Sequence, residues 1–137
     1  MDCPFCAICA GTEPAEVVDE TATTLAFAPL DPVAEGHVLV IPKAHHETLF
    51  DVPASTLCRV VEHAKSIAER LTAHDFDGVT LLNDSSHQQT VPHFHLHLAP
   101  RRDDDGLDLW PESDYEESDV GQTYDGIRRQ LGFNGRG

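Results

Sequence analysis

Residues 93–99 read His93-Phe94-His95-Leu96-His97-Leu98-Ala99, so histidine alternates here with bulky apolar residues. In a β-strand, successive side chains point to opposite faces. The pattern predicts a strand whose apolar side chains face a core while three imidazoles line the other face. Side chains two apart on one strand lie roughly 6.5–7 Å apart, a spacing that suits three rings converging on a small anionic group. Because histidine serves as base or nucleophile near neutral pH, the stretch indicates a functional site.

The segments around this strand predict one long helix and several short strands. Strands are expected over residues 17–18, 23–28, 37–41 and 79–82. Asp51 and Pro53 announce the helix, whose apolar stripe is Leu57, Val60, Val61, Ala64, Ile67, Ala68 and Leu71. Strands flanking one helix favour an α+β fold with a mainly antiparallel sheet. One helix cannot cover both faces of such a sheet, so we expect a homodimer.

Length and composition indicate one compact domain. The 137 residues suit a single domain over residues 1–110, followed by an acidic tail over 111–137. A short helix is expected in the tail over residues 120–131, with Gly132 as its stop. No apolar stretch approaches the length of a membrane span. The first residues lack the basic and apolar regions of a signal peptide, so a cytoplasmic location is expected.

The charge balance is strongly acidic, with 24 Asp and Glu against 9 Lys and Arg and a net charge of −15. Such a surface repels duplex nucleic acid and anionic membranes, which excludes both as expected partners. It also opposes compaction at low salt. We hypothesise a high-salt cytoplasm, in which screening relieves the repulsion; a melting temperature that did not rise between low and molar KCl would exclude this.

Three of the four cysteines, Cys3, Cys6 and Cys9, fall within the first nine residues. A disulfide framework normally spreads its cysteines through a small secreted chain. A tight cluster in an intracellular protein indicates metal or redox chemistry instead. The fourth, Cys58, lies on the apolar helical stripe and is predicted to be a small core residue.

Several motifs together resemble the histidine triad (HIT) nucleotide-binding superfamily, in its zinc-carrying bacterial and archaeal form. Beside the histidine stretch, the resemblance is carried by Gly36-His37-Val38-Leu39-Val40-Ile41-Pro42-Lys43, Gln89-Thr90-Val91-Pro92, Pro100-Arg101 and Cys3-Pro4-Phe5-Cys6. It spans roughly residues 1–110, the length of an ordinary domain. The fold it implies is a small α+β domain that dimerises through its long helix and a strand.

The resemblance implies a nucleotide hydrolase or nucleotidyl transferase. Family members attack the α-phosphorus of purine nucleoside phosphoramidates, dinucleoside polyphosphates or acyl nucleotides. His95 matches the nucleophile, and an imidazole can form a covalent phosphoramidate adduct that water later hydrolyses. Further matched positions are catalytic or substrate-binding: His97 and His37 at the phosphate, Gln89 and Thr90 near the leaving group, and Leu30, Phe27 and Asn83 around the rest of the nucleotide.

The same resemblance implies a structural zinc ion. Its ligands would be Cys3, Cys6, His45 and His93, a closed tetrahedral set with no open position for substrate. Two alternatives stay open from the sequence. Cys6 and Cys9 also form a Cys-x-x-Cys pair, and His46 could replace its neighbour.

Two positions depart from the family pattern. His87-Gln88 replaces the Ala-Gly or Gly-Gly that often precedes the matched glutamine, and the loop is one residue shorter. Glycines there let backbone N–H groups approach a phosphate. Pro29 stands where many members place a ribose-binding aspartate. Nucleotide binding is therefore better supported than recognition of the ribose or of adenine.

Two other kinds of function compete with this hypothesis. The histidines of the strand could ligate a catalytic zinc, giving a metallohydrolase that loses turnover as soon as the metal is removed. The shortened loop is also compatible with a non-catalytic nucleotide-binding or scaffold protein, which would bind nucleotide without forming a covalent adduct. Elsewhere, His63 and His74 are predicted to face solvent or to cap the helix.

Overall fold

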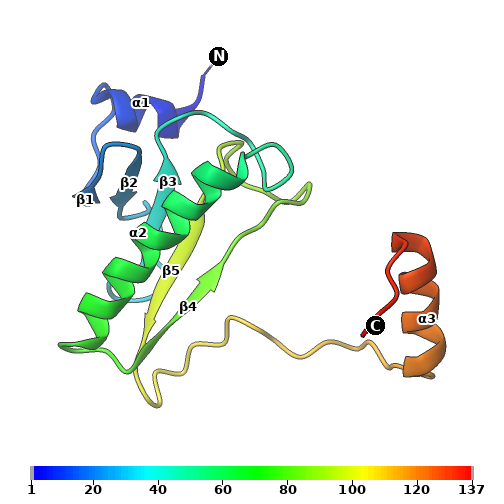
Figure 1. Ribbon diagram of the computed structural model, residues 1–137. Coiled ribbons are helices and arrows are strands. Elements are labelled where there is room, and N and C mark those ends of the chain that lie inside the picture. Colours follow the sequence, from blue (N-terminus) through cyan, green and yellow to red (C-terminus); the bar gives the residue numbers. More distant parts are fainter. Residues whose placement is uncertain (1, 137) are drawn as a thin grey trace. The chain divides into compact units, whose positions relative to one another are not determined.

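The computed structural model describes residues 2–136, which divide into two units between Leu107 and Asp108. The first unit contains a five-stranded antiparallel sheet and two helices (Figure 1). The sheet has the order β1-β2-β3-β5-β4, and the elements of this unit are α1 (Pro4–Ala10), β1 (Val17–Glu20), β2 (Thr24–Phe27), β3 (Val38–Pro42), α2 (Ala54–Thr72), β4 (Gly78–Leu82) and β5 (Leu96–Arg101). The predicted α+β class is confirmed.

The second unit contains one helix, α3 (Val120–Leu131). Asp119 caps its first turn by accepting the N–H of Gln122, and Gly132 ends it in the left-handed conformation. The helix predicted over 120–131 is therefore present. The limits proposed for the domain and its tail, residues 1–110 and 111–137, stay a prediction.

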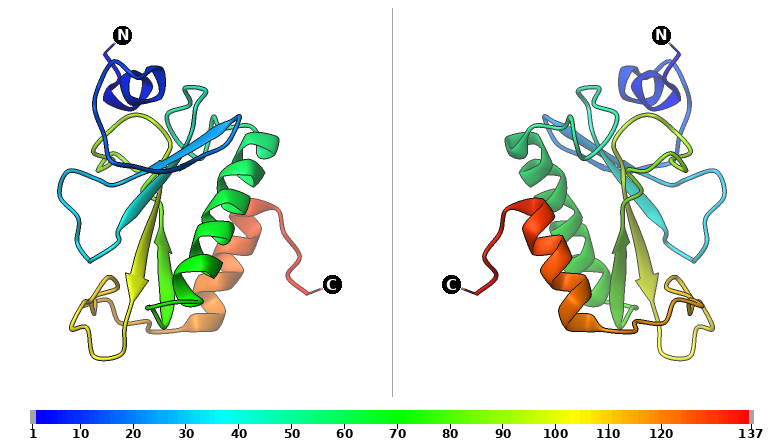
Figure 2. Two further views of the ribbon diagram at one scale, coloured as in Figure 1. Left: turned by 90° about the vertical axis from the view of Figure 1, so that its left-hand side faces the viewer. Right: turned by 90° about the vertical axis from the view of Figure 1, so that its right-hand side faces the viewer.

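The sheet has a different covering on each face. Helix α2 lies against one face (Figure 2), where Phe94 and Leu98 pack with Val60, Ala64 and Ile67 of the helix. On the other side, Phe5 of α1 packs with Phe27 and Leu39. The apolar residues of the histidine stretch thus face the α2 core, as the alternation predicted. The imidazoles are left to the opposite side.

Strand β5 begins later than the sequence predicted. Its ladder with β3 pairs Leu96 with Val40, His97 with Leu39 and Leu98 with Val38. Before Leu96 the backbone leaves this ladder, and the Phe94 N–H donates to the carbonyl of His46 at 2.6 Å. The backbone of Phe94 is therefore held by the loop after β3.

The N-terminal residues form a helix, α1, that was not predicted from the sequence. Pro4 occupies its first turn, the Cys3 thiolate or thiol accepts the N–H of Cys6, and Gly11 ends it with φ of 78°. Proline at the first helical position and glycine after the last are the usual signals of a short helix. The cysteine spacing indicated metal chemistry, although the same stretch of sequence also forms this seven-residue helix.

Two predictions about α2 were wrong. Cys58 is exposed rather than part of the core, and His63 is buried rather than solvent-facing. The His63 Nδ1 lies 2.8 Å from the Thr24 hydroxyl and its Nε2 lies 2.8 Å from an Asp19 carboxylate oxygen. A buried histidine is tolerated because both ring nitrogens have partners on the β1–β2 hairpin. The pairing lowers the pKa of Asp19 and ties the hairpin to the helix.

Among the described residues, none of the helices combines the length and the hydropathy that crossing a bilayer requires.

Candidate active site and metal centre

Three histidines from two neighbouring strands meet on the face of the sheet opposite α2. His37 immediately precedes β3, His95 immediately precedes β5, and His97 is the second residue of β5. The His37 Nε2 lies 3.1 Å from the His97 Nδ1, and the rings of His95 and His97 are 5.0 Å apart. His95 is only 3% exposed. The antiparallel pairing of β3 with β5 brings together residues that are about 60 positions apart in the chain.

The backbone sets the orientation of the His95 ring. Its Nδ1 lies 2.7 Å from the carbonyl oxygen of His93. A carbonyl can only accept, so this nitrogen must carry a proton. In the neutral ring the lone pair is then on Nε2, the nitrogen that can attack an electrophile. Phe5 packs edge-on against the ring at 5.3 Å and restricts its rotation.

The protonation pattern of His37 and His97 follows from a chain of hydrogen bonds. The backbone N–H of Val33 can only donate, and it reaches the His37 Nδ1 at 3.1 Å. Burial lowers the pKa of His37, and burial together with the adjacent histidines lowers that of His97 to about 4. Both rings are therefore neutral near pH 7. The His37 Nε2–H then donates to the His97 Nδ1, which leaves the His97 proton on Nε2.

This arrangement places a nucleophilic nitrogen beside a hydrogen-bond donor. His95 offers a lone pair on Nε2, and His97 offers an N–H on its own Nε2, with ring centres 5.0 Å apart. A donor fixed before the reaction stabilises negative charge that develops on a bound oxyanion. The pair can therefore hold a phosphoryl oxygen while the neighbouring imidazole attacks phosphorus.

His93, the first histidine of the 93–99 stretch, belongs to a different group of side chains. Within residues 2–136, the one set of three or more Cys, His or acidic residues that could hold a metal ion is Cys3, Cys6, His45 and His93. Its four ligand atoms all lie within 4.8 Å of one another. The Cys3 Sγ is 3.3 Å from the His93 Nδ1, and the Cys6 Sγ is 3.2 Å from the His45 Nδ1. The alternatives from the sequence, Cys9 and His46, are outside this set.

The donor set and its spacing fit a tetrahedral zinc ion. With usual Zn–S and Zn–N bonds, ligand atoms at tetrahedral corners are about 3.6 Å apart, close to the distances found here. The His93 Nε2 lies 2.8 Å from the carbonyl of Pro42, so that nitrogen donates and Nδ1 presents its lone pair to the sulphurs. Burial, and next the adjacent Cys3, raise the pKa of the Cys6 thiol to about 11. A cation between the two sulphurs would relieve that cost.

A metal ion in this group would have a structural effect. Four protein ligands leave no position for a substrate or a reactive water. The ligands come from the start of α1, the loop after β3 and the residue before Phe94. Since His93 also supplies the carbonyl that orients His95, a bound ion would hold the backbone that sets the orientation of the candidate nucleophile.

Two further predicted site residues contact the backbone near the histidines. The amide of Asn83 donates to the carbonyl oxygen of His95 at 2.9 Å, and its own oxygen accepts the hydroxyl of Ser85. The amide of Gln89 donates to the carbonyl of Glu47 at 2.6 Å. Asn83 therefore supports the β5 backbone, and Gln89 joins the loop after β4 to the loop after β3.

The remaining predicted residues lie at different depths. Phe27 is buried in the core against Phe5, with ring centres 5.2 Å apart, whereas Leu30 is 99% exposed. Thr90 is exposed in the segment that leads to the histidine stretch. The structure thus brings together His37, His95 and His97. Their proposed roles toward a nucleotide stay predictions.

Residue types alone did not point to three groups that organise the site. The N–H of Val33 and the carbonyl of Pro42 act through the backbone, so their side chains give no signal of the role. Phe5 packs against both His93 and His95. It lies inside the Cys-Pro-Phe-Cys motif, and its position between two proposed ligands was the signal available for it.

The lowered pKa of His97 predicts a contribution to acid sensitivity. From about pH 6.5 down to about pH 4, the unfolded chain binds a proton at this position and the folded chain does not. Stability is therefore lost as the pH falls through this range. The variant His97→Asn should lose less unfolding free energy than the wild type between about pH 7 and about pH 5. Urea titrations at both pH values measure this.

The exposed His74 provides the matched control, since His74→Asn should leave the acid dependence as it is in the wild type. Equal losses of unfolding free energy in the wild type and in His97→Asn would contradict the prediction.

The sequence and the structure are similar to those of known proteins of one family. The model of the HIT domain family matches residues 10–104. An uncharacterised HIT-like protein of Methanocaldococcus jannaschii is 39% identical over 76% of this chain and 82% of its own length. The adenosine 5′-monophosphoramidase of Saccharomyces cerevisiae is 32% identical over 94% of this chain and 82% of its own length. A crystal structure of a zinc-bound histidine triad family protein from Mycobacterium smegmatis superposes with a TM-score of 0.74 at 36% identity, covering 96% of each chain.

Proposed function

This chain belongs to the HIT domain family, and from that premise we propose that it is a nucleotide hydrolase or nucleotidyl transferase acting through His95. The observation that carries the proposal is the hydrogen bond from the His95 Nδ1 to the carbonyl of His93. It leaves the lone pair on Nε2, in a ring whose centre is 5.0 Å from that of His97. The related monophosphoramidase supports a nucleoside phosphoramidate as substrate, with dinucleoside polyphosphates as the second class.

In the proposed first step, the His95 Nε2 attacks the α-phosphorus of the substrate. A bond forms between this nitrogen and phosphorus, and the bond to the leaving amine or phosphate breaks. The leaving group departs with a proton from the Thr90 hydroxyl, which regains one from the solvent. Meanwhile the His97 Nε2–H donates to a non-bridging oxygen and stabilises the charge that develops there.

In the second step, water attacks the phosphorus of the nucleotidyl-histidine. The bond between phosphorus and Nε2 breaks, the ring regains its lone pair, and the nucleoside monophosphate is released. His37 holds His97 in place through both steps by the 3.1 Å contact between their rings. The attacking water loses one proton to the solvent, and His95 is the one residue that forms a bond to phosphorus in these two steps.

The proposed metal is zinc in a structural role, held by Cys3, Cys6, His45 and His93. The zinc-bound relative from Mycobacterium smegmatis supports this choice. The metallohydrolase alternative would require the metal on the three histidines of the stretch. Against it, His93 belongs to the Cys/His group and its other ring nitrogen is bonded to the carbonyl of Pro42, so it is not available to join His95 and His97 around a second ion.

A homodimer stays a prediction. Strand β4 is one edge of the sheet, and apolar side chains are exposed on both elements that would meet a second copy, namely Val61 on α2 and Leu81 on β4. Pairing of the β4 edges would continue the antiparallel sheet and cover these side chains.

The proposal predicts release of AMP from adenosine 5′-phosphoramidate. The purified protein should release AMP from this compound catalytically, and the release should be compared with that from a diadenosine polyphosphate by chromatography. Both substrates carry the α-phosphorus that His95 would attack. Nucleotide binding by calorimetry without release of AMP from either compound would favour the non-catalytic alternative and refute the enzyme.

A further inference from the structure

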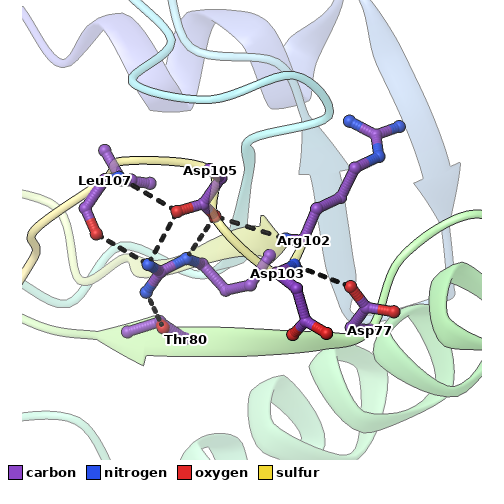
Figure 3. A network of polar contacts seen from close by, with 7 residues as sticks. Asp77, Thr80, Arg102, Asp103, Asp105 and Leu107 are labelled. Carbon is purple, nitrogen blue, oxygen red and sulfur yellow. Dashed lines mark hydrogen bonds and ion pairs between the residues drawn. The ribbon is translucent and has the colours of Figure 1, made fainter.

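The turn after β5 fixes the position of one arginine. The Arg101 guanidinium donates to the Asp105 carboxylate, to the carbonyl of Leu107 and to the hydroxyl of Thr80. Figure 3 labels these three partners. The same Asp105 carboxylate accepts the backbone N–H of Arg102 at 3.2 Å. One residue later, the N–H of Asp103 donates to the Asp77 carboxylate at 2.7 Å. The backbone of Arg102 is therefore held on both sides.

The side chain of Arg102 joins this turn to the loop between β2 and β3. One of its terminal nitrogens lies 2.9 Å from a Glu35 carboxylate oxygen and 2.8 Å from an Asp75 oxygen. The guanidinium carbon also stands 4.2 Å above the ring of Phe76, within the range of a cation–π contact. A single exposed ion pair contributes little, but here one cation separates two carboxylates in a chain with a net charge of −15.

Gly36 brings the loop close to the same place. Its φ of 82° is one that L side chains rarely adopt, and a Cβ at this position would be 3.1 Å from the Pro100 Cγ and 3.5 Å from Phe76. A side chain here would be strained by the positive φ and would press on Pro100, so glycine lets the loop backbone pass close to β5 and Phe76. Glu35, its neighbour, is thereby placed next to Arg102.

The other side of this short loop contacts the active site. The N–H of His37 donates to the carbonyl of Ala34 at 3.1 Å, so the loop closes into a turn just before β3. Within it, the N–H of Val33 donates to the His37 Nδ1, which assigns the ring proton to Nε2 and hence to His97. Arg102 and the His37 ring thus hold the same five-residue turn from opposite sides.

We propose that Arg102 is a positioning residue for the reaction proposed at His95, because its contacts with Glu35 and Phe76 hold the 33–37 turn in the form that keeps the His37 proton on Nε2. Without Arg102, the carboxylates of Glu35 and Asp75 repel each other, because no cation lies between them. The turn then moves away from β5, the N–H of Val33 leaves Nδ1, and His37 exchanges between its two neutral tautomers. His97 consequently loses the contact that orients its donor toward the phosphate.

The test compares Arg102→Met, which keeps an apolar side chain over Phe76 without the charge, with Arg102→Lys, which restores the charge. The matched control is Lys65→Met, which removes the cation of an exposed ion pair with Glu69 on α2. Nitrogen NMR of the imidazole rings in the full-length protein reports the tautomer of each histidine. Steady-state AMP release, with kcat and KM separated, reports the reaction.

We expect wild-type His37 and His97 to show the pattern of neutral rings protonated on Nε2. In Arg102→Met, the two His37 nitrogens should shift toward the average of both tautomers while His95 keeps its proton on Nδ1. The value of kcat should fall roughly 3- to 30-fold, with KM changed less. Arg102→Lys should recover part of both effects, and Lys65→Met should match the wild type.

An unchanged tautomer pattern in Arg102→Met would overturn the proposal, whatever happens to the rate. A shifted pattern with an unchanged kcat would overturn it as well, because the turn would then not matter to the reaction. The inference rests on the proposed function for its kinetic part. The NMR part does not need turnover, so a protein that released no AMP would refute the function and still reveal whether Arg102 sets the His37 tautomer.

Discussion

Replacing His95 by asparagine should reduce AMP release from adenosine 5′-phosphoramidate by about 10⁴-fold or more. The asparagine amide can still donate to the carbonyl of His93, which now accepts the His95 Nδ1–H at 2.7 Å. It has no nitrogen lone pair with which to attack phosphorus. The loss should therefore appear in kcat, while nucleotide affinity changes little. Initial rates measured by chromatography, together with calorimetric titration of AMP, separate the two.

The control for this experiment is His74→Ala, which removes an exposed histidine at the end of α2. It should retain wild-type turnover. Circular dichroism should show that both variants keep the folded structure. Turnover within about tenfold of the wild type in His95→Asn would show that the buried imidazole is not the nucleophile.

Loss of the metal should produce the largest change in stability. The Cys/His group joins the start of α1, the loop after β3 and the residue that orients His95. We expect one zinc ion per chain in the purified protein. The variants Cys3→Ser and Cys6→Ser should lose it and lower the unfolding free energy by about 4 kcal/mol or more. Elemental analysis and urea denaturation measure both quantities.

Cys9 supplies a matched control on the same helix, since it lies in α1 but outside the four-ligand group. Cys9→Ser should keep the zinc and the stability of the wild type. Loss of zinc in Cys9→Ser, or full zinc content in Cys3→Ser, would contradict the ligand assignment. Chelation also tests the metallohydrolase alternative, because there turnover would stop before the fold loosens.

The sequence was most informative where function depends on side chains spaced along one strand. The alternation over residues 93–99 correctly assigned Phe94 and Leu98 to the core below α2. The predicted ligand set matches the group of four side chains that the structure brings within reach of one another. The first prediction uses the short spacing of residues along one strand. The ligand set came from the family resemblance, because Cys3 and His93 are 90 positions apart in the chain.

What the sequence could not supply depends on the backbone and on tertiary packing. The N–H of Val33 and the carbonyl of Pro42 set histidine protonation, and any residue would offer the N–H. The helical period placed Cys58 inside and His63 outside. In the structure His63 is buried, because the β1–β2 hairpin provides partners for both of its ring nitrogens, and Cys58 is exposed. The spacing of apolar residues locates the buried stripe of a helix, but which residues at the edge of the stripe are buried depends on the elements that pack against the helix.

The most direct test of the account is to trap the covalent intermediate. The protein is mixed with adenosine 5′-phosphoramidate, denatured rapidly in alkali, in which a phosphorus–nitrogen bond survives, and examined by mass spectrometry intact and after digestion. We predict a mass increase of one adenylyl group, located on His95 and absent from His95→Asn. Rapid release of AMP with no adduct, or an adduct on another residue, would contradict nucleophilic attack by the His95 Nε2.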